Sequence, residues 1–95
     1  MPEMRFVIRW PDGASETCYS PSLVIKDFFR VGEAYPVEAF AASAREALTI
    51  ASDRVAARYG FPCSRALGQL ARIESVAARF RAQPDAHVFV QAFEE

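Results

Sequence analysis

The sequence is poor in the residues that build most metal, cofactor and nucleotide sites. Two cysteines, one histidine and four glycines occur among 95 residues. Cys18, Cys63 and His87 do not complete a zinc-binding pattern, which needs three or four ligands at workable spacing. Neither a glycine-rich phosphate loop nor the G-x-S-x-G turn of hydrolases is present. We therefore expect no metal and no cofactor.

Long apolar runs and an excess of one charge are also missing. No apolar run approaches the roughly 18 residues that a membrane span needs. The opening MPEMRF carries an acid where a signal peptide carries bases, and it has no apolar region of useful length. The net charge of −1 gives no strong attraction to nucleic acid or to an anionic membrane. We expect a cytoplasmic protein whose cysteines stay thiols, with neither a membrane nor a nucleic acid as partner.

Apolar and aromatic residues, by contrast, are plentiful. The hydrophobic fraction is 52%, with eight Phe, three Tyr and one Trp. We expect residues 1–95 to form a single domain, and a domain of this size buries only about 60 to 68% of its unfolded surface. The surplus apolar surface predicts a second subunit, and hence a homodimer.

The clearest periodic pattern runs from Tyr35 to Pro62 and predicts a long helix. Pro36 suits the first helical position, Gly60 suits a left-handed residue past the end, and Pro62 forbids continuation. Apolar residues recur at three- and four-residue steps and form one stripe: Val37, Phe40, Ala44, Leu48, Ala51, Val55 and Tyr59. Alanines dominate this face, so another backbone can approach closely.

The segment before this helix reads as a hairpin followed by a short helix. Met4 to Trp10 has Phe6, Ile8 and Trp10 on one side and Arg5, Val7 and Arg9 on the other, as in a strand with one buried face, and Ser15 to Ser20 is its return strand. Pro11-Asp12-Gly13 supplies the turn between them. Ser20-Pro21-Ser22 is typical of a helix start and predicts a short helix through Phe29, with a loop over 30–34.

The segment after the long helix reads as another helix and a final strand. A second helix is predicted from Ser64 to Ala82, with an inner stripe of Ala66, Leu67, Leu70, Ile73, Ala77 and Phe80. The short Gly60 to Pro62 connection makes the two long helices antiparallel neighbours or sets them at a sharp angle. Gly68 is expected to mark a close approach of helices, and His87 to Phe93 returns to strand character.

These elements predict an α+β fold in the order β-β-α-α-α-β. We expect a small, mostly antiparallel three-stranded sheet made from the N-terminal hairpin and the C-terminal strand. Three helices should pack on one face of this sheet. The first strand is expected in the middle, since the last strand needs a partner and the second leads away into the helices.

The stretch from Cys18 to Lys26 concentrates candidate ligand-binding groups at a strand-to-helix junction. Cys18, Ser20 and Ser22 supply a thiol and hydroxyls, and Lys26 is the only lysine in the chain. Exposed N–H groups at such a helix start can hold an anion, and Lys26 would add charge. The alternative is an ordinary helix cap, which accounts for Ser20 without any ligand.

Cys63 is the second candidate, because it stands at the start of a helix. The positive end of the helix dipole there can lower the pKa of a thiol enough for it to react. Alternatively, Cys63 fills a small apolar hole beside Phe61, since free cysteine commonly packs as a small hydrophobe. His87 is interpreted as a structural residue, and no residue is assigned a catalytic role.

Three arginines of the second long helix, Arg65, Arg72 and Arg79, follow one another at seven-residue intervals and therefore lie along one line. A basic line of this kind can follow a phosphate backbone. Because no aromatic residue is interleaved for base stacking, we interpret it as a solvated helix face.

At the level of whole stretches, the chain resembles the small nitrogen-starvation-response proteins encoded in bacterial gene clusters with a nitrilase. The resemblance rests on MRFVIRWPDG, ETCYSPSLVIKDFF, YPVEAFAASAREALTIASDRVAARYGF and CSRALGQLARIE. Such clusters are linked with the assimilation of nitriles or cyanide, so the resemblance implies a role in nitrogen acquisition. It carries no catalytic or binding residue over to this chain.

Two functions are compatible with these observations. The first is a non-catalytic accessory or interaction protein, a homodimer that supports enzymes of the same gene cluster in a nitrogen-starvation or nitrile-assimilation pathway. The alternative is a small-molecule-binding protein or a thiol-dependent enzyme. It would use the junction from Cys18 to Lys26 together with Cys63.

Overall fold

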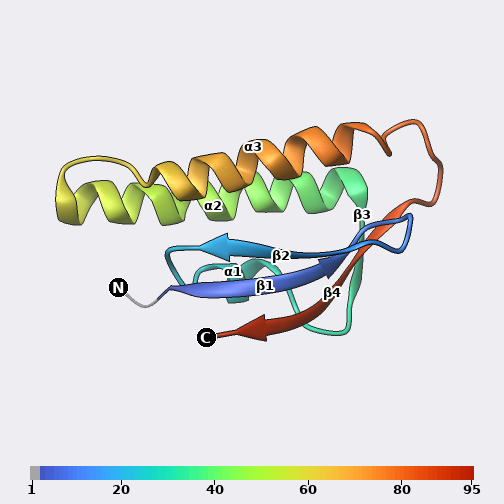
Figure 1. The fold of residues 1–95 in the computed structure, drawn as a ribbon, viewed down its shortest axis with the longest axis horizontal. Coiled ribbons are helices and arrows are strands. Elements are labelled where there is room, and N and C mark those ends of the chain that lie inside the picture. Colours follow the sequence, from blue (N-terminus) through green and yellow to red (C-terminus); the bar gives the residue numbers. More distant parts are fainter. Residues whose placement is uncertain (1–2) are drawn as a thin grey trace.

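The computed structural model describes residues 3–95. Helices lie on one side of an antiparallel sheet, which confirms the α+β prediction (Figure 1). Along the chain the elements are β1 (Met4–Arg9), β2 (Ser15–Ser20), α1 (Ile25–Phe28), β3 (Ala34–Pro36), α2 (Val37–Tyr59), α3 (Ser64–Ala78) and β4 (His87–Glu94).

The sheet has four strands rather than the predicted three, in the order β2-β1-β4-β3. As predicted, β1 is a central strand, antiparallel to β2 on one side and to β4 on the other. The unpredicted strand is β3, which pairs antiparallel with residues 87–89 of β4. Its residues were expected in a loop and a helix start, because three residues are too few to show an alternating pattern.

The core lies between the inner face of the sheet and the helices. Phe6, Ile8 and Trp10 are buried on the inner face of β1 and beyond its end, as their alternation predicts, and Val88 and Val90 of β4 are buried beside them. A cluster of aromatic rings links the sheet to the helical layer. The Trp10 ring meets the rings of Phe40 and Phe80 at centroid distances of 5.9 and 6.1 Å.

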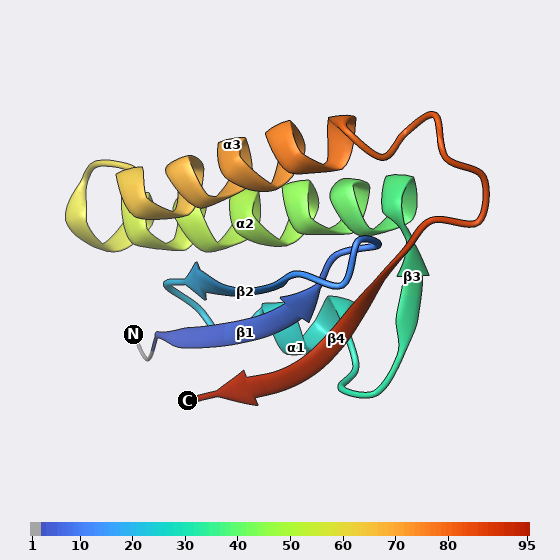
Figure 2. The same cartoon turned by 45° about the vertical axis from the view of Figure 1, so that its right-hand side comes forward.

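Helices α2 and α3 form an antiparallel hairpin along the length of the sheet (Figure 2). Gly60 ends α2 at a φ of 87°, and its N–H donates to the Ala56 carbonyl oxygen at 2.8 Å. Alanines on the inner face of α2 are fully buried, as expected of a closely packed helix: Ala44, Ala47 and Ala51. The expectation for Gly68 is wrong, since a Cβ atom there would meet no atom within 4 Å.

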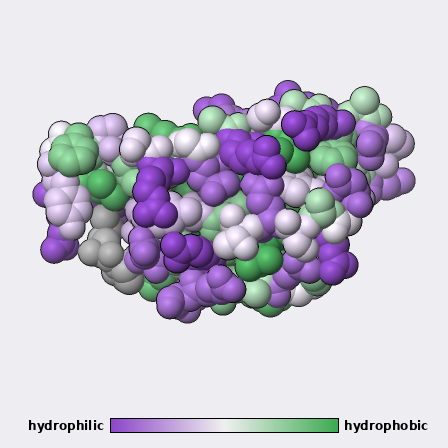
Figure 3. All heavy atoms as spheres, in the orientation of Figure 1, coloured by the Kyte–Doolittle hydropathy of each residue, from purple (hydrophilic) through white to green (hydrophobic). Residues whose placement is uncertain are grey.

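The hairpin extends past the end of the sheet, and this corrects both predicted apolar stripes. Tyr59 and Leu67 were expected inside, but they are 56% and 43% exposed, and Phe61 between the helices is 65% exposed. The turn joining α2 to α3 lies beyond the strands at one end of the molecule (Figure 1). Apolar spheres are visible at that end of the surface (Figure 3). The strands end short of this turn, so these side chains stay largely exposed.

The helix boundaries also differ from the predicted ones. Helix α3 ends at Ala78, four residues before the predicted end, and α1 has only four residues. None of the helices within residues 3–95 has the length and apolar character needed to cross a lipid bilayer.

Candidate functional site

The junction between β2 and α1 is held by a compact network of serine hydroxyls. Ser20 Oγ donates to the Ser22 carbonyl oxygen at 2.7 Å and accepts the Ser22 N–H at 3.2 Å. Ser22 Oγ accepts the Val24 N–H at 3.3 Å. Both serines are buried. The hydroxyls therefore hold the turn between strand and helix but do not cap α1, since its N-cap residue is Val24 and no side chain bonds there.

The Arg54 guanidinium from α2 also takes part in this network of hydrogen bonds. Arg54 Nη1 donates to Ser22 Oγ at 2.9 Å. With the Val24 N–H, this bond occupies both lone pairs of the Ser22 hydroxyl. Arg54 thus ties the junction to the helical layer, a contact that no local sequence pattern signals.

Cys18 lies on the inner face of β2 and is fully buried. Burial, followed by the charge of Glu16, raises the pKa of the Cys18 thiol to about 12, while the charge of Arg72 opposes the shift. A thiol with this pKa is protonated at neutral pH, and a protonated thiol is a poor nucleophile and metal ligand. Among the candidate residues, only Cys63 remains suited to thiol chemistry.

Lys26 is turned toward the C-terminal end of the chain. Its Nζ forms an ion pair with Glu95 Oε2 at 2.8 Å, and both side chains are well exposed. Lys26 therefore lies apart from the buried hydroxyls of Ser20 and Ser22. The five predicted site residues do not line one common cavity.

Cys63 stands at the N-cap of α3, as predicted, and its N–H donates to Ser52 Oγ at 3.2 Å. Its side chain is half-buried and faces a hollow of about 200 Å³. This hollow is lined by Glu3, Tyr19, Pro21, Val55, Tyr59 and Cys63. The expected apolar hole beside Phe61 is not found, because Phe61 points into solvent.

The arginine line of α3 is engaged with β2 rather than wholly solvated. The Arg65 guanidinium lies 3.9 Å from the centroid of the Tyr19 ring. Arg72 forms an ion pair with Glu16 at 3.2 Å, and this hydrogen-bonded partner raises the pKa of Arg72. Two of the three arginines thus help to dock α3 on the edge strand.

Two further hollows lie at the other end of the molecule, where α2 begins. One, of about 420 Å³, is lined by Pro36, Val37, Glu38, Phe80, Arg81, Gln83, Asp85, Ala86 and His87. The other, of about 310 Å³, is lined by Glu38, Ala41, Ala42, Arg45, Glu74 and Arg81. Of these residues, only His87 was considered for a chemical role from the sequence, and it was interpreted as structural. The remaining groups converge because the segment after α3 folds back against the start of α2.

Within residues 3–95, no group of three His, Cys, Asp or Glu side chains is placed to hold a metal ion. The fold defines a small α+β protein in which a helical hairpin covers, and projects beyond, a four-stranded antiparallel sheet.

The sequence model of the nitrogen starvation-induced protein NitG family matches residues 5–93. The chain belongs to this family, in agreement with the resemblance to nitrogen-starvation-response proteins. No curated protein and no solved structure matches the chain.

Proposed function

We propose that this chain is a non-catalytic accessory protein of the nitrogen-starvation response, which acts in the cytoplasm by binding other proteins. It forms a homodimer and supports enzymes of a nitrilase-containing gene cluster that assimilates nitriles or cyanide. Membership of the nitrogen starvation-induced family supports the physiological setting. The exposed end of the helical hairpin supports binding to a protein.

The observation that carries this proposal is the concentration of large apolar side chains at the hairpin end, a surface defined by Tyr59, Phe61 and Leu67. Their exposed fractions are 56%, 65% and 43%. Aromatic side chains are enriched in the buried centres of protein interfaces, where each removes a large apolar area from water. The Arg58 guanidinium lies 5.7 Å from the Tyr59 ring centroid and adds a second group common in interfaces.

Light scattering after size-exclusion chromatography, over a series of concentrations, tests the homodimer. We expect the wild type to be a dimer and the double variant Tyr59→Ser, Phe61→Ser to be a monomer with an unchanged circular dichroism spectrum. Val31→Ser is the matched control, because Val31 is 50% exposed but lies in the segment between α1 and β3. A wild type that stays monomeric at the highest concentration contradicts the homodimer.

Affinity capture from nitrogen-starved cells tests the accessory role. The tagged wild type and the Val31→Ser control should recover enzymes of the gene cluster, and the double variant should lose them. If the wild type recovers none of those enzymes, the accessory role is rejected.

The hollow beside Cys63 favours a second candidate, a protein that binds a small molecule or acts through its thiol. Cys63 borders this hollow together with Tyr19 and Pro21 of the predicted junction. Alkylation with iodoacetamide as a function of pH distinguishes the candidates, with Cys63→Ser as the blank. If Cys63 reacts as a thiolate at a pH well below 9.0, the ordinary pKa of a thiol, thiol chemistry is supported. Reactivity like that of a free thiol rejects this second candidate.

A further inference from the structure

The two hollows at the start of α2 adjoin each other, because Glu38 and Arg81 line both, and we treat them as the two parts of one surface groove. We call it the end groove. Glu38, Arg81 and Asp85 bring charges of both signs to its larger part, and the His87 imidazole borders it as well. The ion pairs found within residues 3–95 are Lys26 with Glu95, Arg45 with Glu74, and Arg72 with Glu16. The four groups of the larger part are therefore not neutralised by one another.

The backbone fixes the shape of this groove. The Val37 N–H at the start of α2 donates to the Ala86 carbonyl oxygen at 3.1 Å, which holds the returning segment against the helix. Asp85 turns that segment with a φ of 64°. The Phe80 ring stacks on the buried Trp10 ring and also lines the groove. A groove tied to both the helix and the core can present its charged groups in a constant arrangement.

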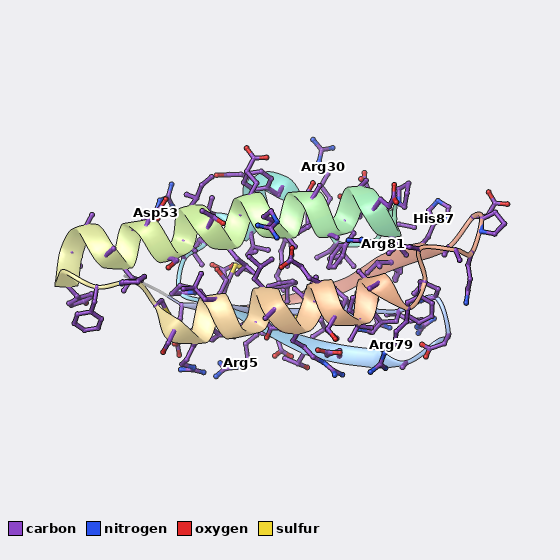
Figure 4. All side chains as sticks on the ribbon, turned by 90° about the horizontal axis from the view of Figure 1, so that it is seen from above. Arg5, Arg30, Asp53, Arg79, Arg81 and His87 are labelled. Atoms are coloured by element: carbon purple, nitrogen blue, oxygen red, sulfur yellow. The ribbon has the colours of Figure 1, made fainter. Side chains whose placement is uncertain are left out.

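The side chains of Arg81 and His87 both lie near the beginning of α2. Arg81 lies on the α2 side of α3, whereas Arg79 lies on the opposite side, and His87 stands beyond the first turn of α2 (Figure 4). His87 Nδ1 is 2.7 Å from the Asp85 carbonyl oxygen. Because that oxygen only accepts, Nδ1 donates, and in the tautomer with its proton on Nδ1 the other nitrogen, Nε2, is an acceptor.

We propose that the end groove binds a small zwitterion that carries a carboxylate and an ammonium group, which is the chemistry of a free amino acid. The planar Arg81 guanidinium takes the carboxylate through two parallel hydrogen bonds. The carboxylates of Glu38 and Asp85, with Nε2 of His87, take the ammonium group. A hollow of about 420 Å³ lies in the size range of small-molecule sites. The charged groups are exposed, so we expect binding in the millimolar range.

Titrations followed by ¹H–¹⁵N correlation spectra test the ligand class with three related probes. L-Alanine carries both charges, propionate carries only the carboxylate, and ethylamine carries only the ammonium group. We expect saturable shifts with L-alanine, centred on residues 80–87 and on the first turn of α2, and at least tenfold weaker binding of either half-charged probe. Absence of saturation with L-alanine overturns the proposal. Propionate binding as tightly as L-alanine overturns it too, because the site would then be a plain anion site.

Matched charge-removing variants test the residues. Arg81→Gln and Glu38→Gln should each weaken L-alanine binding at least tenfold. Arg79→Gln and Glu46→Gln remove the same charges outside the groove and should leave the affinity unchanged. Spectra that superimpose away from the substituted positions establish that each variant is folded. Equal losses in Arg79→Gln and Arg81→Gln overturn the proposal, since the effect would then come from net charge alone.

This experiment is independent of the proposed association. The end groove is lined by residues at the start of α2, whereas Tyr59 and Phe61 lie at the other end of this helix, where the chain turns into α3. Figure 2 shows how far apart the two ends of α2 are. The double variant of the hairpin end can therefore be titrated as well, and it should bind L-alanine as the wild type does. If this variant does not bind L-alanine, ligand binding depends on association of the chain. That result would contradict the proposal that one chain holds the complete site.

Discussion

Gly60 is the residue whose backbone conformation permits the helical hairpin. It sits at the end of α2 with a φ of 87°, in the left-handed region where a Cβ atom is strained. We predict that Gly60→Ala lowers the free energy of unfolding by about 1 to 2 kcal/mol, because the strain is local and no neighbouring atom needs to move. Urea unfolding followed by circular dichroism measures the change.

Gly68 provides the opposite case for the same substitution. It lies inside α3, where a Cβ atom would meet open space. Gly68→Ala should therefore raise the free energy of unfolding by about 1 kcal/mol through helix propensity. If both alanine variants lost stability equally, the explanation from the left-handed conformation at Gly60 would fail.

The buried thiol of Cys18 makes stability depend on pH in the alkaline range. Its pKa is about 12 in the folded chain and 9.0 in a free thiol. Between these values the unfolded chain loses the proton while the folded chain keeps it, so the stabilisation is complete below pH 9 and is lost as the pH rises. We predict a loss of about 1.4 kcal/mol for each pH unit in this window.

Urea unfolding at several pH values, on the wild type and on Cys18→Ala, isolates this effect. The variant loses stability at every pH through its cavity, so the slopes are compared rather than the absolute values. The pKa of Tyr19 is also raised, first by burial, and contributes to both proteins alike. Equal slopes in the two proteins would show that Cys18 does not carry the dependence.

At the scale of elements, the tight packing of α2 depends on the small size of its alanines. Ala47 is fully buried on the inner face, whereas Ala39 is exposed on the same helix. We predict that Ala47→Leu lowers the free energy of unfolding by about 1 to 3 kcal/mol, because the added carbons must displace packed neighbours. Thermal and urea unfolding measure this loss.

Ala39→Leu is the control for Ala47→Leu. Leucine is nearly as good a helix former as alanine, so the exposed substitution should change stability by less than about 0.5 kcal/mol. Equal stability of both leucine variants would mean that the inner face of α2 has spare volume.

The elements that could be predicted are those whose own residues form a clear local pattern of apolar and polar positions. Phe6 and Ile8 lie on the opposite side of β1 from Arg5 and Arg9, so this strand follows from a local pattern. The same is true of α2, whose periodic apolar residues lie between Pro36 and Gly60. Strand β3 exists only because β4 supplies its hydrogen-bonding partner, and three residues cannot signal that. Tyr59 was expected inside because periodicity shows which face is apolar, but not how far the sheet extends beneath it.

The candidate sites could be predicted only in part, for a similar reason. The serines of the β2–α1 junction were recognised from their hydroxyls, but Arg54, which contacts Ser22, comes from a distant helix. The end groove combines Glu38 with Arg81, residues that are brought together by the return of the chain after α3. Tertiary convergence of this kind leaves no periodic signal in the sequence.

At the scale of the whole molecule, the two ends have different chemistry. The hairpin end exposes aromatic side chains, while the end groove gathers charges of both signs. The principal extents of 41 × 23 × 18 Å show how elongated the molecule is. Because α2 runs between the two ends, the proposed partner and the proposed small ligand can be bound at the same time without competing for surface.

The C-terminal strand joins these parts into one cooperative structure. β4 lies between β1 and β3, and it contributes the fully buried Val88 and Val90. We predict that deleting residues 87–95 abolishes cooperative unfolding, because the deletion removes the strand partner of β1 and opens the core. Deleting Glu95 alone removes only an exposed ion pair with Lys26 and should cost about 0 to 1 kcal/mol. Urea unfolding of both truncations decides the matter: a cooperative transition in the longer deletion would mean that the hairpin and the helices form a core without β4.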